Sequence, residues 1–242
     1  MIIYGINPVL EAIRAGRVKA VRMTRGAGGR LADVAEAARL AGLAVRPASA
    51  PELDRAARGG VHQGVVAEVA GETNLDIADL LAAASGAPLV VVLDGVEDPH
   101  NVGAILRTVD AAGADGVVRQ SRHAAALDGA AAKASAGAVA HVRIAEVVNI
   151  ARALEELKDA GVWTVGLAGD AATRYDEIDF SLPTALVVGA EGHGLRRLVR
   201  ERCDRLAAIP MQGHVASLNV SVAAGVALFE AVRQRRASKR ET

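Results

Sequence analysis

Cysteine, aromatic residues and long apolar runs are scarce in this chain, and each scarcity excludes a class of protein. Cys203 is its single cysteine, which rules out an internal disulfide framework and suits a reducing compartment. Although 51% of the residues are hydrophobic, no apolar run approaches the roughly 20 residues that a membrane-spanning helix needs. Residues 1–8 lack the basic region and small-residue cleavage site of a secretory signal. We therefore expect a cytoplasmic protein that is not inserted in a membrane.

The charge balance narrows the way in which this chain can bind nucleic acid. Its formal net charge is zero, which argues against a surface that binds nucleic acid everywhere. Of its 28 basic residues only four are lysine, and the planar guanidinium of arginine binds phosphate in a bidentate manner. Coding bias in an arginine-rich proteome explains the same excess. Because aromatics make up 2% of the chain, RNA contacts should depend on arginine, backbone and shape rather than on base stacking.

The composition changes near residues 70–87, and we interpret residues 71–87 as a linker between two domains. Residues 1–70 alternate between short strand and helix patterns, which predicts a small α/β domain. The expected strands are Val18–Met23, Ala44–Arg46 and Val65–Val69, and the expected helices are Val9–Arg14, Leu31–Ala41 and Pro51–Ala57.

Residues 88–242 carry a longer alternation of strands and helices. Strands that are apolar throughout and alternate with helices predict a parallel sheet covered on both faces. Ligands of such open α/β sheets bind at the carboxyl edge of the strands. The expected strands are Leu89–Leu93, Gly116–Val118, Val142–Ile144, Val162–Leu167, Ala185–Val188 and Leu206–Ile209, and the expected helices are Val102–Ala112, Leu127–Ala134, Ile150–Ala160, Leu195–Cys203 and Leu218–Arg235.

Polar residues gather in the loops after three of these strands, and the first such loop is Asp94–Arg107. Asn101 stands where a helix N-cap is expected, and Gly103 permits close backbone approach. Arg107 follows one turn after Gly103, so its guanidinium can cover the same pocket. The alternative is an ordinary capped helix in which Arg107 pairs with Asp110 at i+3.

The second polar loop, Gly189–Gly194, has its glycines in the order G-x-x-G-x-G. This order departs from the dinucleotide fingerprint G-x-G-x-x-G, and no acidic residue ends the next strand to hold a ribose. A nicotinamide or flavin enzyme therefore has weak support. Glu191 would oppose phosphate and would suit a hydroxyl, an amide or a cationic ligand, although a role in capping the next helix is a fair alternative.

The third polar loop, Ser217–Ser221, opens an almost wholly apolar helix. Ser217 or Asn219 can cap that helix, or the pair can orient a hydroxyl beside Glu191. Three histidines lie in or beside these loops, but their spacing matches no metal-ligand pattern, so we expect no metal site. These histidines are His100, His193 and His214.

The three loops in this order resemble the three signature motifs of the SpoU-type RNA ribose 2′-O-methyltransferases. Together with an N-terminal segment similar to that family's substrate-binding domain, the resemblance covers essentially the whole chain. The motifs are Asn101-x-Gly103-x-x-x-Arg107, Val188–Gly192, and Ile209–Met211 with Ser217–Ala223, and the N-terminal matches are Tyr4–Asn7 and Val61–Gly64.

The resemblance implies a ribosomal-protein-like RNA-binding domain at 1–70 and a SPOUT-type catalytic domain at 88–242. It implies a deep trefoil knot in the C-terminal third, with S-adenosylmethionine bound in the knotted loops. It also implies a homodimer through the knot region, with which an apolar final helix is compatible. The implied substrate is RNA, with a guanosine of 23S rRNA as the expected target.

Site residues follow from the resemblance motif by motif. Gly189, Ile209 and Leu218 are expected to contact the cofactor, the first two through backbone groups. The matching catalytic set is Asn101, Arg107, Glu191, Ser217 and Asn219.

The family's proposal that the arginine assists deprotonation is chemically awkward, because a guanidinium stays protonated at ordinary pH. We therefore expect Arg107 to hold the adjacent phosphate and to lower the pKa of the 2′-hydroxyl, with water or that phosphate accepting the proton.

Alternatives to this interpretation concern the substrate and the activity itself. The same chemistry on tRNA, or on the rRNA site whose methylation gives thiostrepton-type resistance, is the nearer alternative. A non-catalytic RNA-binding protein with this fold is the more distant one. The chain also departs from the family's habit at Arg119–Gln120, where relatives often have proline. His193 stands between the glycines of the second motif, where the residue varies within the family, and both features concern substrate fit.

Overall fold

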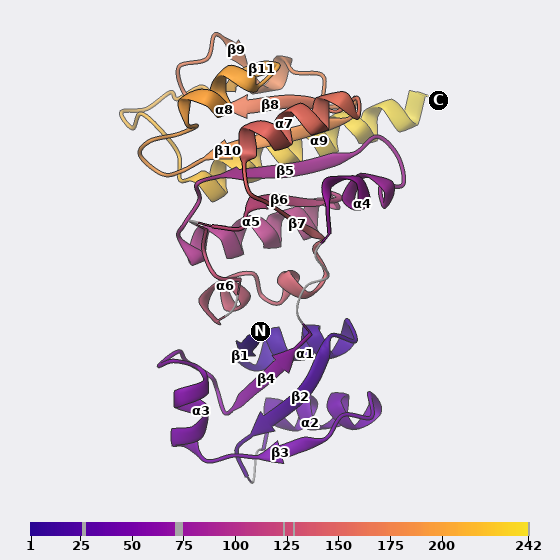
Figure 1. The fold of residues 1–242 in the computed structure, drawn as a ribbon, viewed down its shortest axis with the longest axis vertical. Helices are drawn as coiled ribbons and strands as arrows, with labels where there is room; N and C mark the ends of the chain where they lie inside the picture. The colour runs from indigo at the N-terminus through magenta and orange to yellow at the C-terminus, as the bar shows by residue number, and fades with distance from the viewer. Residues whose placement is uncertain (26–27, 71–74, 123, 128, 242) are drawn as a thin grey trace. The chain divides into compact units, whose positions relative to one another are not determined.

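The computed structural model describes residues 1–25, 28–70, 75–122, 124–127 and 129–241. The chain forms two compact units, which are described separately below (Figure 1). Unit 1 comprises Met1–Thr73, Pro99–Arg107 and Ala125–His141, and unit 2 comprises Asn74–Asp98, Thr108–Ala124 and Val142–Thr242. Part of the expected linker, residues 71–74, lies outside the described residues.

Unit 1 contains a four-stranded mixed sheet in the order β1-β4-β2-β3. Strand β4 runs antiparallel to β1 and β2, whereas β2 and β3 are parallel. Two of the expected strands, β2 (Val18–Met23) and β4 (Val65–Val69), have the predicted bounds. Strand β1 was not predicted, because three residues are too few to show a periodic pattern. The other bounds are Ile2–Tyr4 for β1, Val45–Pro47 for β3, Ile6–Arg14 for α1, Arg30–Leu40 for α2 and Ala50–Ala56 for α3.

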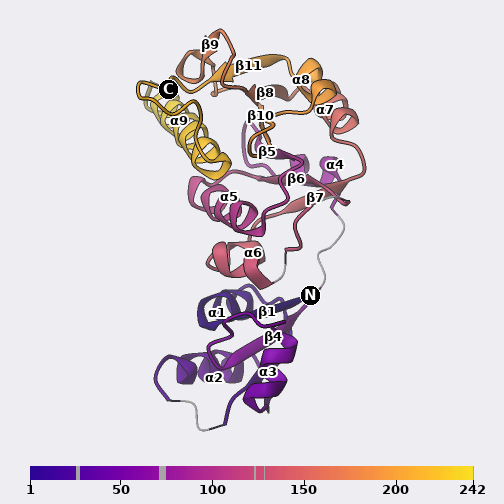
Figure 2. The same ribbon diagram turned by 90° about the vertical axis from the view of Figure 1, so that its left-hand side faces the viewer.

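Helices cover both faces of this small sheet. Helices α1 and α2 lie on one face and α3 on the other (Figure 2). The α3 side has its own apolar cluster, in which Leu53 packs with Tyr4 and Val66. Helix α3 begins in a capping box, since the backbone N–H of Ser49 donates to Glu52 Oε2 at 2.7 Å.

Unit 2 is built on a seven-stranded sheet in the order β7-β6-β5-β10-β8-β11-β9. Every strand pair in it is parallel, which confirms the predicted parallel sheet. All six residues of β5 and of β10 are buried, as expected for strands covered on both faces. The bounds are β5 Leu89–Asp94, β6 Gly116–Gln120, β7 Ile144–Val147, β8 Trp163–Leu167, β9 Thr173–Arg174, β10 Thr184–Gly189 and β11 Arg205–Ala208.

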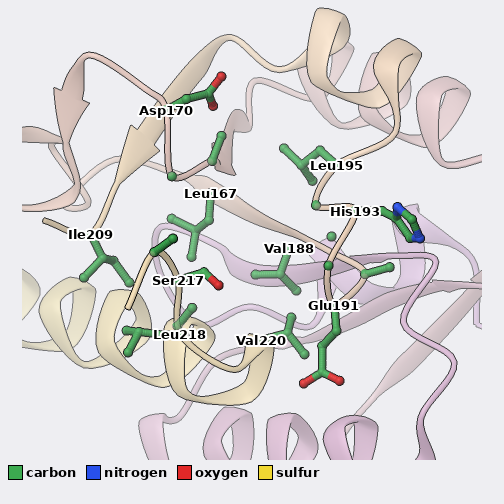
Figure 3. Close-up of a pocket in the computed structure, with 18 of the residues that line it drawn as sticks. Leu167, Asp170, Val188, Glu191, His193, Leu195, Ile209, Ser217, Leu218 and Val220 are labelled. Carbon is green, nitrogen blue, oxygen red and sulfur yellow. The ribbon is translucent and has the colours of Figure 1, made fainter. Parts of the chain in front are cut away.

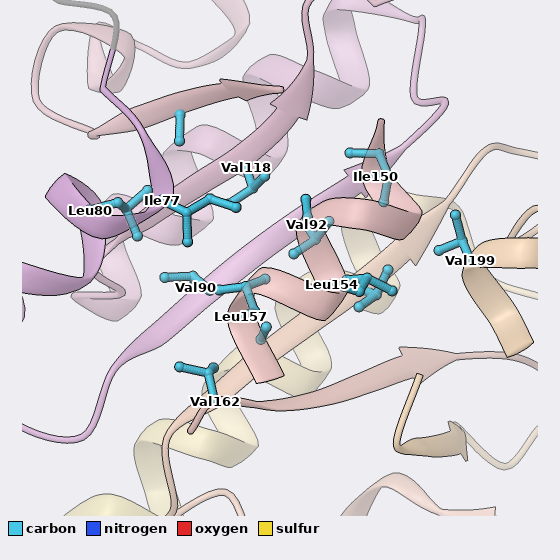
Figure 4. Packing of buried hydrophobic residues seen from close by; sticks show 14 residues of the cluster. Ile77, Leu80, Val90, Val92, Val118, Ile150, Leu154, Leu157, Val162 and Val199 are labelled. Atoms are coloured by element: carbon cyan, nitrogen blue, oxygen red, sulfur yellow. The ribbon is translucent and has the colours of Figure 1, made fainter. Parts of the chain in front are cut away.

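Helices also cover both faces of the unit 2 sheet, with α4, α7 and α8 on one side and α9 on the other (Figure 2). Leu154 and Leu157 of α7 pack against the sheet in an apolar cluster (Figure 4). Ile77 and Leu80 of α4 belong to the same cluster, so this part of the segment expected as a linker lies in the core of unit 2. The bounds are α4 Ile77–Ala82, α7 Ile150–Asp159, α8 Arg197–Arg202 and α9 Val220–Glu241.

The helix that carries the first motif starts earlier than the sequence pattern suggested. Helix α5 spans Pro99–Ala112, so the expectation that Asn101 is its N-cap is wrong. Proline suits the first helical position because its ring fixes φ and it needs no N–H partner there. Asn101 therefore lies within the first turn and is 6% exposed.

Three shorter helices complete the described chain, and no helix among the described residues is long and apolar enough to cross a membrane. The expected trefoil knot stays a prediction. The short helices are α6 (Gly129–Ala134), η1 (Ala138–Ala140) and η2 (Tyr175–Glu177).

Candidate functional site

A pocket of about 330 Å³ opens at the carboxyl edge of the unit 2 sheet (Figure 3). Strands β10, β8 and β11 are neighbours and run in parallel, so the loops that follow them meet at this edge. Two of these loops carry the second and third motifs. The lining residues are Leu167, Ala168, Gly169, Asp170, Val188, Gly189, Ala190, Glu191, Gly192, His193, Gly194, Leu195, Arg200, Ala207, Ile209, Met211, Ala216, Ser217, Leu218, Val220 and Ala223.

The loop after β10 folds back over its own first residue. The N–H of Gly194 donates to the carbonyl of Ala190 at 2.8 Å, and both Gly192 and Gly194 have positive φ angles, 76° and 64°. A Cβ on Gly189 would lie 2.1 Å from the carbonyl carbon of Gly194. The glycine pattern of the second motif therefore has a steric cause, because only glycine fits at position 189.

Glu191 and Asn219 join the second and third motif loops. The side-chain amide of Asn219 donates to Glu191 Oε1 at 2.5 Å, across 28 residues of sequence. Glu191 lines the pocket, so its carboxylate is held at the pocket by a group from the other loop. This contact brings together two of the residues that the resemblance placed in the catalytic set.

Asn219 also caps helix α9, which was the structural alternative for this residue. Its Oδ1 accepts hydrogen bonds from the N–H of Ser221 at 2.9 Å and from the Ser221 hydroxyl at 2.6 Å. The cap orients the amide plane, so that the opposite side of the group, Nδ2, faces Glu191. Capping and contact with Glu191 are therefore two consequences of one side-chain orientation.

The remaining pocket residues expected from the motifs form its walls. Gly189, Ile209 and Leu218 all line the pocket, together with Ser217. Ile209 and Leu218 lie on one side and Leu195 on the other, and Ser217 lies beside Leu218 (Figure 3). The arrangement combines apolar walls with a few polar groups, which is the usual character of a small-molecule site.

The sequence analysis did not identify one of the loops that form the pocket, namely the loop that follows β8. Gly169 and Asp170 line the pocket from this loop, and Arg200 lines it from α8. Arg200 holds the carboxylate of Asp170 in two hydrogen bonds of 2.8 and 3.0 Å. These bonds lower the pKa of Asp170 below its ordinary value. A Gly-Asp pair after a predicted strand was the available signal, but it matches no motif.

The two first-motif residues, Asn101 and Arg107, lie on α5 within unit 1, whereas the pocket belongs to unit 2. Asn101 is buried and Arg107 is exposed. Gly103 serves helix packing, because a Cβ there would lie 2.5 Å from the carbonyl oxygen of Ala131 in α6. Gly103 therefore does allow the close approach of a backbone, and that backbone belongs to helix α6.

Among the residues that the structure describes, no three His, Cys, Asp or Glu side chains form a group that could hold a metal ion. Cys203 is partly buried, and this burial raises the pKa of its thiol to about 12. It therefore stays protonated at ordinary pH and offers no thiolate.

Comparison with known proteins assigns this chain to a family. Residues 88–229 match the SpoU rRNA Methylase family, and residues 2–75 match the family described as RNA 2'-O ribose methyltransferase substrate binding. The 23S rRNA (guanosine-2'-O-)-methyltransferase RlmB of Xylella fastidiosa is 46% identical over 239 residues, which are 96% of each chain.

Solved structures give the same result. The SpoU methyltransferase AviRb from Streptomyces viridochromogenes, in complex with the cofactor AdoMet, superposes with a TM-score of 0.82 at 27% identity, covering 98% of this chain and 91% of that one. A structure that gives insight into 2-OH methylation of C/U34 on tRNA has a TM-score of 0.57 at 30% identity, and covers 62% of this chain and 98% of its own. The chain therefore belongs to the SpoU rRNA methylase family.

Proposed function

We propose that this protein transfers a methyl group from S-adenosylmethionine to a ribose 2′-hydroxyl of RNA, with a guanosine of 23S rRNA as its target. The observation that carries the proposal is the hydrogen bond between Asn219 and Glu191 at the pocket. Two motif loops meet there, and they present a carboxylate and an amide that suit a hydroxyl group. The Glu191 carboxylate repels phosphate, which disfavours a nucleotide-phosphate site at this position.

The pocket residues fit S-adenosylmethionine. Apolar side chains such as Ile209 and Leu218 form walls for an adenine ring, and Gly189 lines the same pocket. Two acidic residues, Glu191 and Asp170, are among those that line the pocket, and their negative charge suits a ligand with a positive charge. S-adenosylmethionine supplies an activated methyl group on a positively charged sulfur. Gly189, Ile209 and Leu218 would hold the cofactor.

The chain's own groups orient the acceptor hydroxyl and promote loss of its proton. Glu191, Ser217 and Asn219 accept and donate the hydrogen bonds that position the 2′-hydroxyl, and Asn101 is assigned to this catalytic set by the family resemblance alone. Arg107 binds the neighbouring phosphate and lowers the pKa of the hydroxyl, and water or that phosphate accepts the proton. A guanidinium is not a base at ordinary pH. Positioning and electrostatics then provide most of the acceleration.

Arg107→Lys tests this assignment, because lysine keeps the charge and loses the bidentate fork. We expect turnover to fall by about ten-fold or more, as is typical when one charge-assisted contact is lost. Near-normal turnover with an unchanged pH dependence would contradict the bidentate role.

The N-terminal segment favours rRNA over tRNA as substrate. The RlmB relative matches 96% of this chain, whereas the structure concerned with tRNA methylation matches 62% of it. We propose that residues 1–70 form the RNA-binding domain and that 88–242 form the catalytic domain. Within the expected linker 71–87, helix α4 packs in the core of unit 2 and therefore belongs with the catalytic domain. Methylation of the thiostrepton-resistance site remains the alternative rRNA target.

We also propose that the protein is a cytoplasmic homodimer that associates through its knotted C-terminal region. Val222 and Phe229 stand two turns apart on α9, and each is 50% exposed. Large apolar side chains exposed on one helix face suit an interface between subunits. Analytical ultracentrifugation tests the dimer, with Val222→Glu/Phe229→Glu expected to sediment as a folded monomer. A monomeric wild-type protein would overturn it.

A map of 2′-O-methyl groups in the rRNA and tRNA of a deletion strain tests the activity and its target together. We expect one guanosine of 23S rRNA to lose its methyl group and to regain it when the wild-type gene, but not a Glu191→Gln gene, is restored. An unchanged rRNA map in the deletion strain would exclude the assignment, and a methyl group lost from tRNA would establish the alternative substrate.

A further inference from the structure

A buried carboxylate lies beneath the second motif loop and has no part in the mechanism above. Asp94 is the last residue of β5 and its side chain is fully buried. It accepts hydrogen bonds from the backbone N–H of Arg196 at 2.8 Å and from Arg196 Nε at 2.6 Å. A buried charge is costly unless it is paired and hydrogen-bonded, and Arg196 satisfies both conditions.

The contact joins the two ends of the loop that carries Glu191. In the parallel pairing of β5 with β10, Asp94 stands opposite Gly189, where the loop begins. Its side chain binds Arg196, where the loop ends and α8 is about to start. Gln120 Oε1 accepts a further bond from Arg196 Nη2 at 2.9 Å, which fixes the guanidinium to the end of β6 as well.

Burial does not hold the loop between these ends. The four residues from Glu191 to Gly194 are exposed, and two of them are glycines with positive φ. A glycine-rich exposed segment loses much conformational entropy when it is ordered. Hydrogen bonds within the loop and from Asn219 act on its middle, and the Asp94 carboxylate is the buried group that holds its two ends together.

We propose that Asp94 is a positioning residue, which closes the loop from Gly189 to Arg196 and so sets the cofactor contact at Gly189 and the carboxylate of Glu191. This inference rests on the proposed function. Asp94 acts through Arg196 and does not itself touch the pocket, since it is absent from the residues that line it.

Asp94→Asn tests the proposal with little change in volume. The asparagine keeps one acceptor oxygen, but its amide N–H₂ replaces the other oxygen and cannot accept a bond from Arg196. We expect the Kd for S-adenosylmethionine, measured by calorimetry, to rise about ten-fold. Trypsin cleavage after Arg196 or Arg197 should accelerate, and kcat for RNA should stay low at saturating cofactor because Glu191 is displaced.

Arg196→Ala and the double variant separate positioning from simple charge loss. Arg196→Ala keeps the backbone N–H bond to Asp94 but leaves the buried carboxylate without its counter-ion, so it should weaken cofactor binding at least as much as Asp94→Asn does. The double variant should bind no more weakly than Asp94→Asn, because both changes interrupt one contact. An additive loss in the double variant would contradict a shared role.

Asp204→Asn is the matched control. Asp204 is another carboxylate that binds a backbone N–H, that of Thr164 at 2.9 Å, but its partners Thr164 and Lys158 lie in β8 and α7 and not in the loop from Gly189 to Arg196. The Asp204→Asn substitution should lower the urea concentration at the midpoint of unfolding and leave the Kd for S-adenosylmethionine unchanged. If Asp94→Asn behaves like this control, Asp94 is only structural and the inference is wrong. If the wild-type chain does not bind S-adenosylmethionine at all, the proposed function fails instead.

Discussion

The side-chain amide of Asn219 donates a 2.5 Å hydrogen bond to Glu191 while its oxygen caps helix α9. The helix cap fixes which way the amide faces, so the start of α9 and the carboxylate at the pocket are mechanically linked. A change at Asn219 that keeps the cap should therefore affect only the contact with Glu191. This separation allows the contact to be tested without unfolding the helix.

Asn219→Asp should make activity depend on pH. Aspartate caps helices as well as asparagine does, but it places a second carboxylate against Glu191. Two carboxylates in contact raise the pKa of one of them. We expect turnover at pH 8 to fall by about ten-fold or more and to recover in part toward pH 6, where one shared proton restores the hydrogen bond. The rate of single-turnover methylation, measured from about pH 5.5 to about pH 8.5, tests this expectation.

A uniform loss of activity across that pH range would argue against the shared proton. Ser221→Ala is the companion variant, because it removes only one bond to Asn219 Oδ1. It should give a smaller loss with no new pH dependence.

Gly189→Ala should abolish cofactor binding. The added Cβ would lie 2.1 to 2.4 Å from backbone atoms of Gly194 and Leu195, and backbone atoms cannot move aside as a flexible side chain can. The loop must therefore open, and its contacts at the pocket are lost. Calorimetric titration with S-adenosylmethionine measures the effect. Gly213→Ala is the control, since a Cβ there meets nothing within 4 Å, and a wild-type Kd for Gly189→Ala would refute the steric argument.

Arg235→Met should destabilise the fold without touching the pocket. The guanidinium donates to the carbonyl oxygens of Phe180 at 2.8 Å, and of Pro88 and Leu182 at 3.0 Å each, so it ties α9 to segments that precede β5 and β10. Removal leaves several carbonyls without this donor, and we expect the free energy of unfolding to fall by about 2–3 kcal/mol. Urea denaturation measures this. Arg236→Ala, an exposed neighbour, should change stability by less than about 0.5 kcal/mol.

Asp204 should contribute stability that is lost in acid. Burial disfavours its charged form, but hydrogen bonds from the backbone and hydroxyl of Thr164 and from Lys158 outweigh burial, so the pKa of Asp204 lies below its ordinary value of 3.8. Because the folded-state pKa is depressed, the contribution is present above pH 3.8 and is lost as the pH falls through the folded-state pKa.

The gap in unfolding free energy between wild type and Asp204→Asn should therefore be about 1–2 kcal/mol at neutral pH and should shrink toward pH 3. Trp163 is the single tryptophan and precedes Thr164 in β8, so its fluorescence reports unfolding of this unit. A gap that stays constant with pH would show that the carboxylate charge does not matter.

The pattern of apolar residues predicted those strands and helices that are long enough for the pattern to repeat. All six residues of β5 are buried, and the uninterrupted apolar run showed this directly. Strand β9 spans two residues and has no such period, so it was missed. The start of α5 was wrong because Asn101 has the residue type of a cap, whereas Pro99 begins the helix.

The sequence by itself determined the alternation of strands and helices, the polar loops and the family to which the chain belongs, because side-chain periodicity and turn chemistry are local properties. Only the tertiary structure decided which loops meet. Asp94 and Arg196 bind each other across 102 residues, and Asp170 joins the pocket because β8 lies between β10 and β11. Strand order depends on long-range packing of the whole sheet, which no local spacing records.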